Sequence, residues 1–221
     1  MRREFKLEGR IYIVRRKNKK MNRTNGIHIA FGIVYLATLV IAEQCQIPTP
    51  IEDIDVDKFP KTWYQGLHTN DPVMSEDVLC SKLQNFTKTK EGWKMVITEY
   101  HKNSPPRVFP SRHIRQRKGV YTIDKKDDLG TITSQTLSSD GGFNEAAAAI
   151  DDALLSRELL ELSDYKNYFI TAFCSLTGEW IVWAHFPTPN PDVRQVSKMW
   201  NTLIDYRIAV KLYPCKKINW K

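Results

Sequence analysis

Residues 56–66 read VDKFPKTWYQG, in which a short acidic turn containing Pro60 is followed at once by Trp63 and Tyr64. The aromatic pair opens a run, residues 62–69, whose composition is typical of a β-strand. The structural role of Trp63 and Tyr64 depends on the residues on either side of them, beginning with those that precede the turn.

The chain before this stretch has the pattern of a secretion signal. From Met21 it has a basic start, an almost uncharged apolar run over residues 27–41, and a small-residue cleavage site that ends at Ala42. A buried helix or a single membrane anchor is the weaker alternative, because the run is short for a bilayer span and no second run follows. We therefore expect an extracellular, secreted protein with no membrane span in its mature chain.

This pattern divides the chain into two parts. Residues 1–42 are expected to form a leader that includes the signal peptide at 21–42. Residues 43–221 are expected to form a single domain, long enough to bury a substantial core. The sequence leaves open whether translation starts at Met1 or at Met21.

Most of the excess basic charge belongs to the leader. The whole chain has 33 Lys and Arg against 25 Asp and Glu, a formal net charge of +8. Ten of the basic and two of the acidic residues lie in residues 1–42, so 23 of each remain in the mature chain. A near-neutral mature chain argues against a nucleic-acid partner, although residues 112–118 form a local basic run.

The mature chain has four cysteines, Cys45, Cys80, Cys174 and Cys215. They include no CxxC pair and have no nearby His, so two disulfides are a better interpretation than a metal site. Disulfides also suit the oxidising compartment that a secretion signal implies. Asn85 begins an N-x-T glycosylation acceptor, which is consistent with secretion.

The middle of the chain is a series of short strand-like runs separated by turn residues. Consecutive strands joined by short links favour an antiparallel meander, which at this length closes most easily into a barrel. The expected strands are residues 62–69, 78–89, 93–102, 107–115, 120–125, 131–137, 158–162, 168–174 and 179–186. Pro110 makes the fourth of these an irregular or edge strand.

One helix is expected at residues 191–206, after the last long strand and packed on the outside of the barrel. Asn190 is the expected N-cap, and the expected apolar stripe is Val193, Val196, Trp200 and Leu203. A final strand at residues 209–213 leads to Cys215.

The order of these features resembles the lipocalins. That family has a short helical turn and a G-x-W-Y segment on the first strand, which here reads KTWY at residues 61–64. It also has a T-D-Y segment between the sixth and seventh strands, which here reads LSDYKNY at residues 162–168, and a helix after the eighth strand. The resemblance implies an all-β fold, an eight-stranded antiparallel up-and-down β-barrel with one C-terminal external α-helix.

Two finer resemblances concern branches of the family. EQC at residues 43–45 and SDYKNYFITAFC at 163–174 resemble the apolipoprotein D branch, which implies disulfides from Cys45 to Cys174 and from Cys80 to Cys215. GVYTIDKK at residues 119–126 is similar to a segment of the salivary lipocalins of blood-feeding insects, including triabin and the haem-carrying nitrophorins.

The chain departs from the family pattern at two positions. Lys61 stands where a Gly is usual, and His185 stands where an Arg usually packs across the Trp. The resemblance still implies that Trp63 plugs the closed end of the barrel while Asp164 and Tyr165 hold the neighbouring turn. We therefore interpret these residues, together with His185, as structural.

The third expected strand indicates where a ligand would lie. Trp93, Met95 and Ile97 alternate along it and share a face with Glu99 and His101. If Trp93 is deep and His101 is near the mouth, the pocket is apolar below and polar at the rim. The alternative is that the apolar residues are only core.

Three functional hypotheses follow. The main one is a secreted carrier that binds or transports a small hydrophobic ligand, such as a lipid, a pigment, or an amine that pairs with Glu99. A second is a salivary-type inhibitor that binds a host protein through its mouth loops, to which the insertion at residues 138–158 would belong. A third is a haem carrier with His101 as axial ligand. Our primary expectation, however, is that the protein has no cofactor. The sequence contains no enzyme motif, so catalysis is not expected.

Overall fold

The computed structural model describes residues 6–7, 10–11, 45–70, 78–124, 156–216, 218 and 220. The chain divides into two units, residues Met1–Glu43 and Gln44–Lys221. In the first unit, β1 (Lys6–Leu7) pairs with β2 (Arg10–Ile11) in antiparallel fashion. The expected signal peptide, the expected strand at 131–137 and nearly all of the 138–158 insertion lie outside the described residues.

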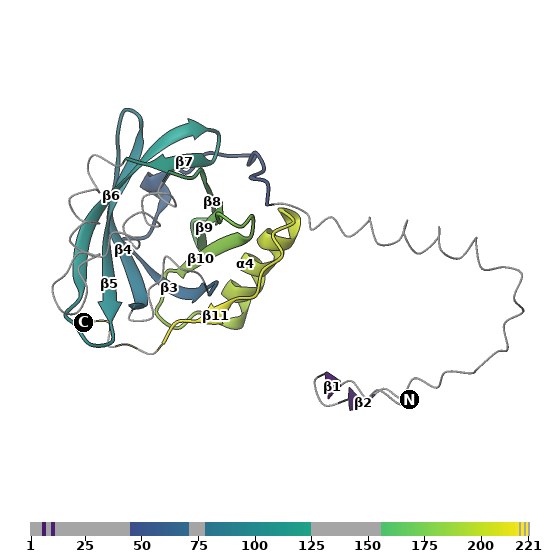
Figure 1. The fold of residues 1–221 in the computed structure, drawn as a ribbon. Coiled ribbons are helices and arrows are strands. Elements are labelled where there is room, and N and C mark those ends of the chain that lie inside the picture. The colour runs from purple at the N-terminus through teal and green to yellow at the C-terminus, as the bar shows by residue number, and fades with distance from the viewer. Residues whose placement is uncertain are drawn as a thin grey trace, which may run out of the picture. The chain divides into compact units, whose positions relative to one another are not determined.

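Eight strands of the second unit form a closed antiparallel barrel, so the expected fold class is confirmed (Figure 1). Each strand pairs with the next along the chain, and the last pairs back onto the first. In order they are β3 (Thr62–His68), β4 (Val78–Lys88), β5 (Gly92–His101), β6 (Arg107–Arg117), β7 (Val120–Ile123), β8 (Leu159–Ser163), β9 (Phe169–Cys174) and β10 (Trp180–Phe186). The short strand β11 (Tyr213–Pro214) pairs with β3 and is shorter than the strand expected at 209–213.

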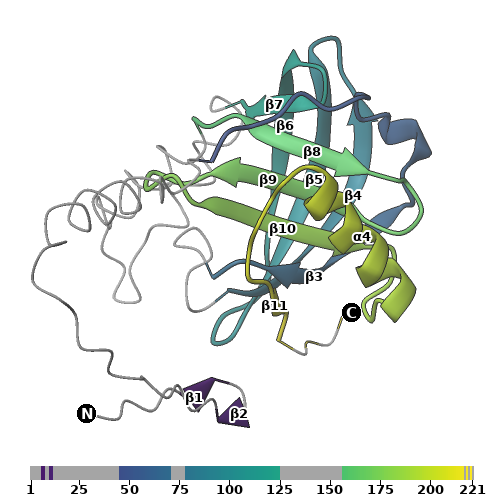
Figure 2. The ribbon, with the colours of Figure 1, turned by 90° about the vertical axis from the view of Figure 1, so that its right-hand side faces the viewer.

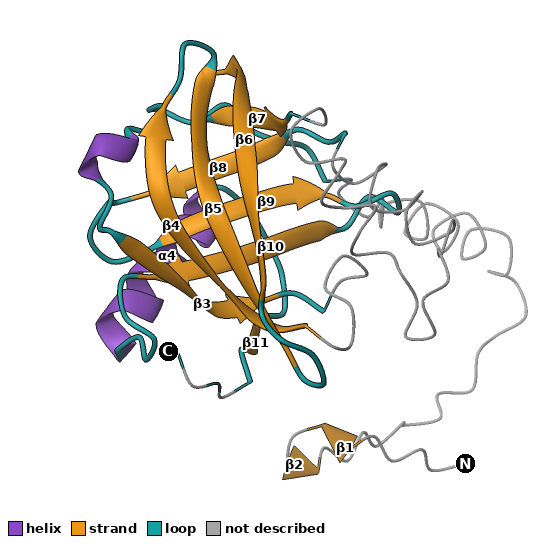
Figure 3. Cartoon of the chain, turned by 90° about the vertical axis from the view of Figure 1, so that its left-hand side faces the viewer, coloured by secondary structure: helices purple, strands orange, loops and turns teal. Residues whose placement is uncertain are grey.

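The three long strands β4, β5 and β6 lie side by side and form one wall of the barrel (Figure 3). Pro110 lies within β6, opposite Val96 of β5. On the other side, β6 pairs with β7 only from His113 to Arg117. Pro110 therefore occupies a stretch of β6 with no partner strand on its second side among the described residues, which suits a residue without an N–H.

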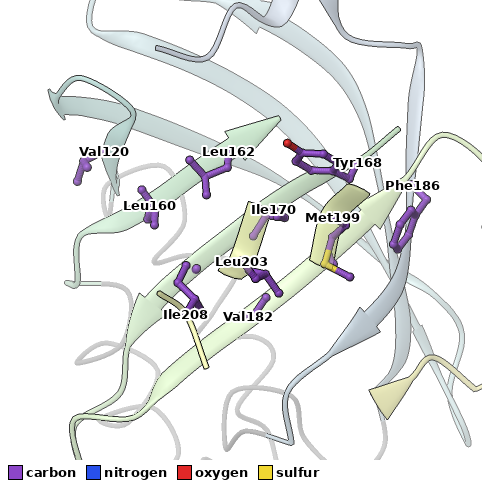
Figure 4. Close-up of a cluster of buried hydrophobic side chains, with 12 residues drawn as sticks. Val120, Leu160, Leu162, Tyr168, Ile170, Val182, Phe186, Met199, Leu203 and Ile208 are labelled. Atoms are coloured by element: carbon purple, nitrogen blue, oxygen red, sulfur yellow. The ribbon is translucent and has the colours of Figure 1, made fainter. Parts of the chain in front are cut away.

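Helix α4 (Val193–Asp205) packs on the outer face of β9 and β10 (Figure 2). Met199 and Leu203 are fully buried in a cluster with the outward-facing residues of these strands (Figure 4). Strands β8, β9 and β10 are accordingly buried on both faces, which explains their nearly continuous apolar sequence.

The expected N-cap of this helix was wrong, and the expected apolar stripe was right at Val196 and Leu203 but wrong at Val193 and Trp200. The N-cap is Asp192, which forms a capping box with Gln195. Val193 is 83% exposed and Trp200 is 40% exposed, so the buried stripe consists of Val196, Met199 and Leu203. The missed residue, Met199, lies three positions after Val196 and four before Leu203, which is the usual spacing of one helix face.

Residues 56–66, VDKFPKTWYQG, close the floor of the barrel. The one-turn helix η1 (Val56–Lys58) leads to Phe59, whose ring lies 5.5 Å from Trp63 and 5.1 Å from Phe169. Trp63 is completely buried in a cluster that we call the floor cluster. Its buried members are Val56, Trp63, Leu83, Trp93, Met95, Tyr121 and Phe169. Tyr64 points to the opposite face of β3, where its ring lies 5.0 Å from Trp220. The two rings therefore pack on opposite faces of the same strand.

Candidate ligand-binding site

The barrel contains a cavity of about 80 Å³. All eight barrel strands contribute to its lining, because alternate residues of each strand point inward. The apolar lining residues are Leu83, Met95, Ile97, Ile123, Leu159 and Trp183, and the polar ones are Gln65, Ser81, Glu99, Ser111, His113, Thr171 and His185. The lining therefore offers apolar surface and hydrogen-bonding groups in the same small space.

The five residues expected to line a pocket occupy three different places. Met95, Ile97 and Glu99 line the cavity. Trp93 is 1% exposed and lies in the floor cluster instead. His101 is not among the lining residues, and its Nε2 lies 3.5 Å from the Glu99 carboxylate. The shared face of β5 thus runs from the packed floor, along the cavity, to an acid–histidine pair.

A chain of hydrogen bonds links four residues, of which Ser111 and His113 line the cavity. Nδ1 of His113 lies 2.6 Å from Oε1 of Glu161, and Nε2 of His113 lies 3.2 Å from Oγ of Ser111. The second oxygen of Glu161 accepts a hydrogen bond of 3.2 Å from the indole N–H of Trp93. The Trp93 and His113 rings are stacked, with centroids 4.1 Å apart. These contacts hold the buried carboxyl group of Glu161 and the buried ring of His113 in one fixed geometry.

A second polar group lines the same cavity. The Gln65 side-chain oxygen accepts hydrogen bonds from the backbone N–H of Ser81 at 2.9 Å and from the Ser81 hydroxyl at 3.0 Å. Nε2 of His185 lies 3.5 Å from the same hydroxyl. The backbone donor fixes the orientation of the Gln65 amide, since only its oxygen can accept from an N–H.

Burial changes the pKa values of two groups beside the cavity. Removal from water raises the pKa of the Glu161 carboxyl, and the contacts with His113 and Trp93 oppose that effect only in part. Burial lowers the pKa of His185 to about 3, so this imidazole is neutral at physiological pH. No Lys or Arg lines the cavity among the described residues. The described lining therefore offers no Lys or Arg side chain to a negatively charged ligand.

Sequence reasoning missed Ser111, His113 and Glu161. Ser111 and His113 alternate with Arg112 and Ile114, so a strict alternation would have placed both on one face of the strand. Their link to Glu161 spans 48 residues and depends on the closure of the barrel, which no local pattern records.

The described residues do not fit a haem at His101. Its ring does not line the cavity, and the cavity of about 80 Å³ is far smaller than the roughly 300–1,000 Å³ of pockets for drug-sized ligands. No group of three or more His, Cys, Asp or Glu that could hold a metal occurs in the described part of the chain.

The residues interpreted as structural lie around the barrel floor. Tyr165 donates its hydroxyl to the backbone oxygen of Asp53 at 3.0 Å and holds the segment before η1. Asp164 accepts hydrogen bonds from the backbone and side chain of Asn167 at 2.6 Å. Although partial burial acts to raise it, these bonds hold the pKa of Asp164 below its usual value. His185 differs from the expectation in one respect, because it lines the cavity.

Both expected disulfides are present. Cys45 is bonded to Cys174 and Cys80 to Cys215, each with a Cα–Cα distance of 5.6 Å. The first ties the segment before η1 to β9, and the second ties the end of the chain to β4. Asn85 is exposed on β4, so its side chain is accessible, and its glycosylation stays a prediction.

The three arginines of the basic run at residues 112–118 are paired with acidic side chains. Its ion pairs are Arg112 with Glu91 at 2.9 Å and Asp124 at 3.3 Å, Arg115 with Asp53 at 2.9 Å, and Arg117 with Glu158 at 2.8 Å.

A wider hollow of about 760 Å³ lies beside these pairs, between the segment around residue 54 and strands β5 and β6. It is more open to solvent than the barrel cavity, so the cavity is the better candidate for enclosing a ligand.

Comparison with known proteins identifies the fold. The sequence matches no family model and no curated protein. Among solved structures, the cockroach allergen Per a 4 superposes with a TM-score of 0.54 at 16% identity, covering 78% of this chain and 94% of its own. Lobster apocrustacyanin A1 superposes with a TM-score of 0.50 at 13% identity, covering 78% of this chain and 91% of its own.

The barrel, the floor cluster and the external helix define the lipocalin fold, and this chain has it. The resemblances to the apolipoprotein D and salivary branches stay predictions. Among the described residues, no helix is long and apolar enough to cross a membrane.

Proposed function

We propose that this protein is a secreted carrier that binds one small, largely apolar ligand inside its barrel. The observation that carries the proposal is the cavity lined by all eight strands, with Met95, Ile97 and Trp183 on its apolar side. Binding by enclosure needs no reacting group, and transport or sequestration of the ligand would follow from it. The two disulfides and the signal-like pattern at residues 21–42 support secretion.

The size of the cavity limits the ligand. A volume of about 80 Å³ accommodates only a small molecule, or the leading end of a longer one such as a lipid. Glu99 lines the same cavity and is the residue that would receive an amine, if the ligand has one.

The experiment combines native mass spectrometry of protein from its source with binding of a hydrophobic fluorescent probe. The probe is expected to bind with a stoichiometry near one and to quench tryptophan fluorescence, because Trp183 lines the cavity. Met95→Glu should abolish binding, since an unpaired charge in an apolar site costs several kcal/mol. The matched control is Thr98→Glu, which places the same charge on β5 opposite Lys82, away from the cavity.

The small volume of the cavity also favours the second hypothesis, a protein that acts on a partner protein through its surface. Retention of full probe binding by Met95→Glu, together with a source protein that has no bound small molecule, would contradict the carrier. Capture of a host protease or receptor by the same preparation would then support the inhibitor.

A further inference from the structure

The polar side of the cavity determines which end of a ligand can enter it. Ser111 and His113 line the cavity, and the Glu161 carboxyl contacts Nδ1 of His113. All three residues are deeply buried, each at most 2% exposed. This differs from the apolar bottom with polar groups only at the rim that the sequence of β5 predicts. A deep polar group has to be satisfied by a ligand or by water, because an unpaired one is costly.

Charge balance favours two proton arrangements in the buried Glu161–His113 pair over a carboxylate with a neutral imidazole, which would leave a net negative charge inside the barrel. A buried pair is cheapest when its net charge is zero, either as a carboxylate with an imidazolium or as a carboxylic acid with a neutral imidazole. In the first state both ring nitrogens of His113 carry protons. In the second the acid donates to Nδ1, so the ring proton is on Nε2. Both states therefore place a proton on the nitrogen that faces Ser111.

This assignment decides the role of the Ser111 hydroxyl. In both states Nε2–H of His113 would donate to Oγ of Ser111, which lies 3.2 Å away, and the Ser111 O–H would be left to donate elsewhere. The same assignment prevents His113 from removing the proton of Ser111, because its facing nitrogen is already protonated. The Ser–His–Glu sequence of contacts is thus a donor chain and not a nucleophile with its base.

Gln65 presents a second donor. Its side-chain oxygen is occupied by the two hydrogen bonds from Ser81, which leaves the amide NH₂ as the group available to the cavity. The fixed polar groups offered by Ser111 and Gln65 are therefore both hydrogen-bond donors.

We propose that the cavity receives the ligand with an uncharged hydrogen-bond acceptor first, a carbonyl oxygen of the ketone, ester or amide type, held by Ser111 and Gln65. This inference rests on the proposed carrier function and specifies its ligand class. A carboxylate is excluded as the leading group, because no Lys or Arg lines the cavity in the described residues while Glu99 does. A hydrocarbon end is disfavoured because it would leave both donors unpaired.

The test compares three probes of equal chain length, 2-octanone, octanoate and octane, in titrations followed by tryptophan fluorescence. Ser111→Ala should weaken 2-octanone binding by roughly tenfold, which is the usual effect of one lost hydrogen bond, and leave octane binding unchanged. Thr98→Val is the control, because it removes a hydroxyl from β5 at a position outside the cavity lining. If Ser111→Ala does not fold, Ser111→Cys, which keeps most of the volume but is a weak donor, serves instead.

The outcomes separate this inference from the proposed function. If Ser111→Ala leaves the binding of octane and of 2-octanone equally unchanged, the proposed carrier function stays intact, but the inference that a hydrogen-bond acceptor enters first is overturned. Octanoate as the tightest probe would also overturn it. No binding of any probe would contradict both proposals. Covalent acylation of Ser111 by p-nitrophenyl acetate would show that His113 accepts a proton, and would overturn the donor assignment.

Discussion

Trp93 on β5 donates its indole N–H to the carboxylate of Glu161 on β8 at 3.2 Å, across the interior of the barrel. The two residues lie 68 positions apart in sequence and on strands that are not neighbours in the sheet. The bond joins the packed floor to the polar side of the cavity. The packing of the floor and the position of Glu161 therefore both depend on the Trp93 side chain.

Trp93→Phe tests that dependence. The variant keeps an aromatic ring but leaves one oxygen of a fully buried carboxylate without its donor, so we expect a loss of about 2–4 kcal/mol in the free energy of unfolding. Urea unfolding followed by circular dichroism measures it. Trp200→Phe on the exposed face of α4 is the control and should change stability by less than about 0.5 kcal/mol. Equal effects of the two variants would contradict a special role for Trp93.

Acid sensitivity is expected from His185. Its pKa is about 3 in the folded chain against 6.5 for the free side chain, so the unfolded chain binds a proton in this window and the folded chain does not. The contribution of His185 to stability is therefore fully present above pH 6.5 and is lost as the pH falls. Between pH 7 and pH 5 the loss should be roughly 2 kcal/mol. His185→Gln should therefore make the free energy of unfolding fall less steeply between pH 7 and pH 5. Carboxylates with lowered pKa values stay ionised in this range, so they do not cause the fall. An unchanged slope would contradict the assignment.

The disulfide between Cys45 and Cys174 should contribute strongly to stability. Replacement of both residues by Ser is expected to cost about 2–5 kcal/mol, because the bond closes a loop spanning 129 positions. The measurement is urea unfolding without reductant, with peptide mapping to establish that Cys80 still pairs with Cys215. A variant as stable as the parent would mean that hydrogen bonds alone, such as that from Cys45 N to Gly178 O, hold this segment.

Heparin and DNA should bind the mature protein weakly, because the basic run of β6 is paired with acidic residues. Removal of one partner makes the test specific: Asp53→Asn leaves Arg115 without its carboxylate and should increase retention on heparin. The readout is the salt concentration at which the protein elutes. Glu52→Gln is the matched control, because Glu52 is exposed and forms no ion pair with a basic residue in the described part of the chain. Tight, steeply salt-dependent binding of the unaltered protein would contradict the expectation.

The fold could be predicted because its signals are local. The strand-like runs, the turn residues between them and the helix near residue 200 appear in short windows, and the resemblance then supplied closure and the disulfide pairing. The helix stripe failed for a local reason: Trp200 is large and apolar, yet Met199 is the residue that meets β9 and β10. Sequence periodicity could not distinguish two adjacent apolar positions.

The site could be predicted only along β5. Alternation placed Met95, Ile97 and Glu99 on one face, and these residues line the cavity. Alternation within one strand carries no information about what faces it across the barrel. The partnership of His113 with Glu161, and the resulting donor at Ser111, therefore became visible only in three dimensions.

The two disulfides cross along the chain, from 45 to 174 and from 80 to 215. A protease that cuts one peptide bond anywhere between Cys45 and Cys215 separates no fragment, because at least one bridge always spans the cut. Two cuts in different intervals between successive cysteines also leave every cysteine-containing piece attached. Only cleavage in all three intervals yields two separate cross-linked products. Protein nicked once in this span would thus run as one species on a non-reducing gel and as two fragments after reduction, so a single cut in a surface loop releases no barrel strand.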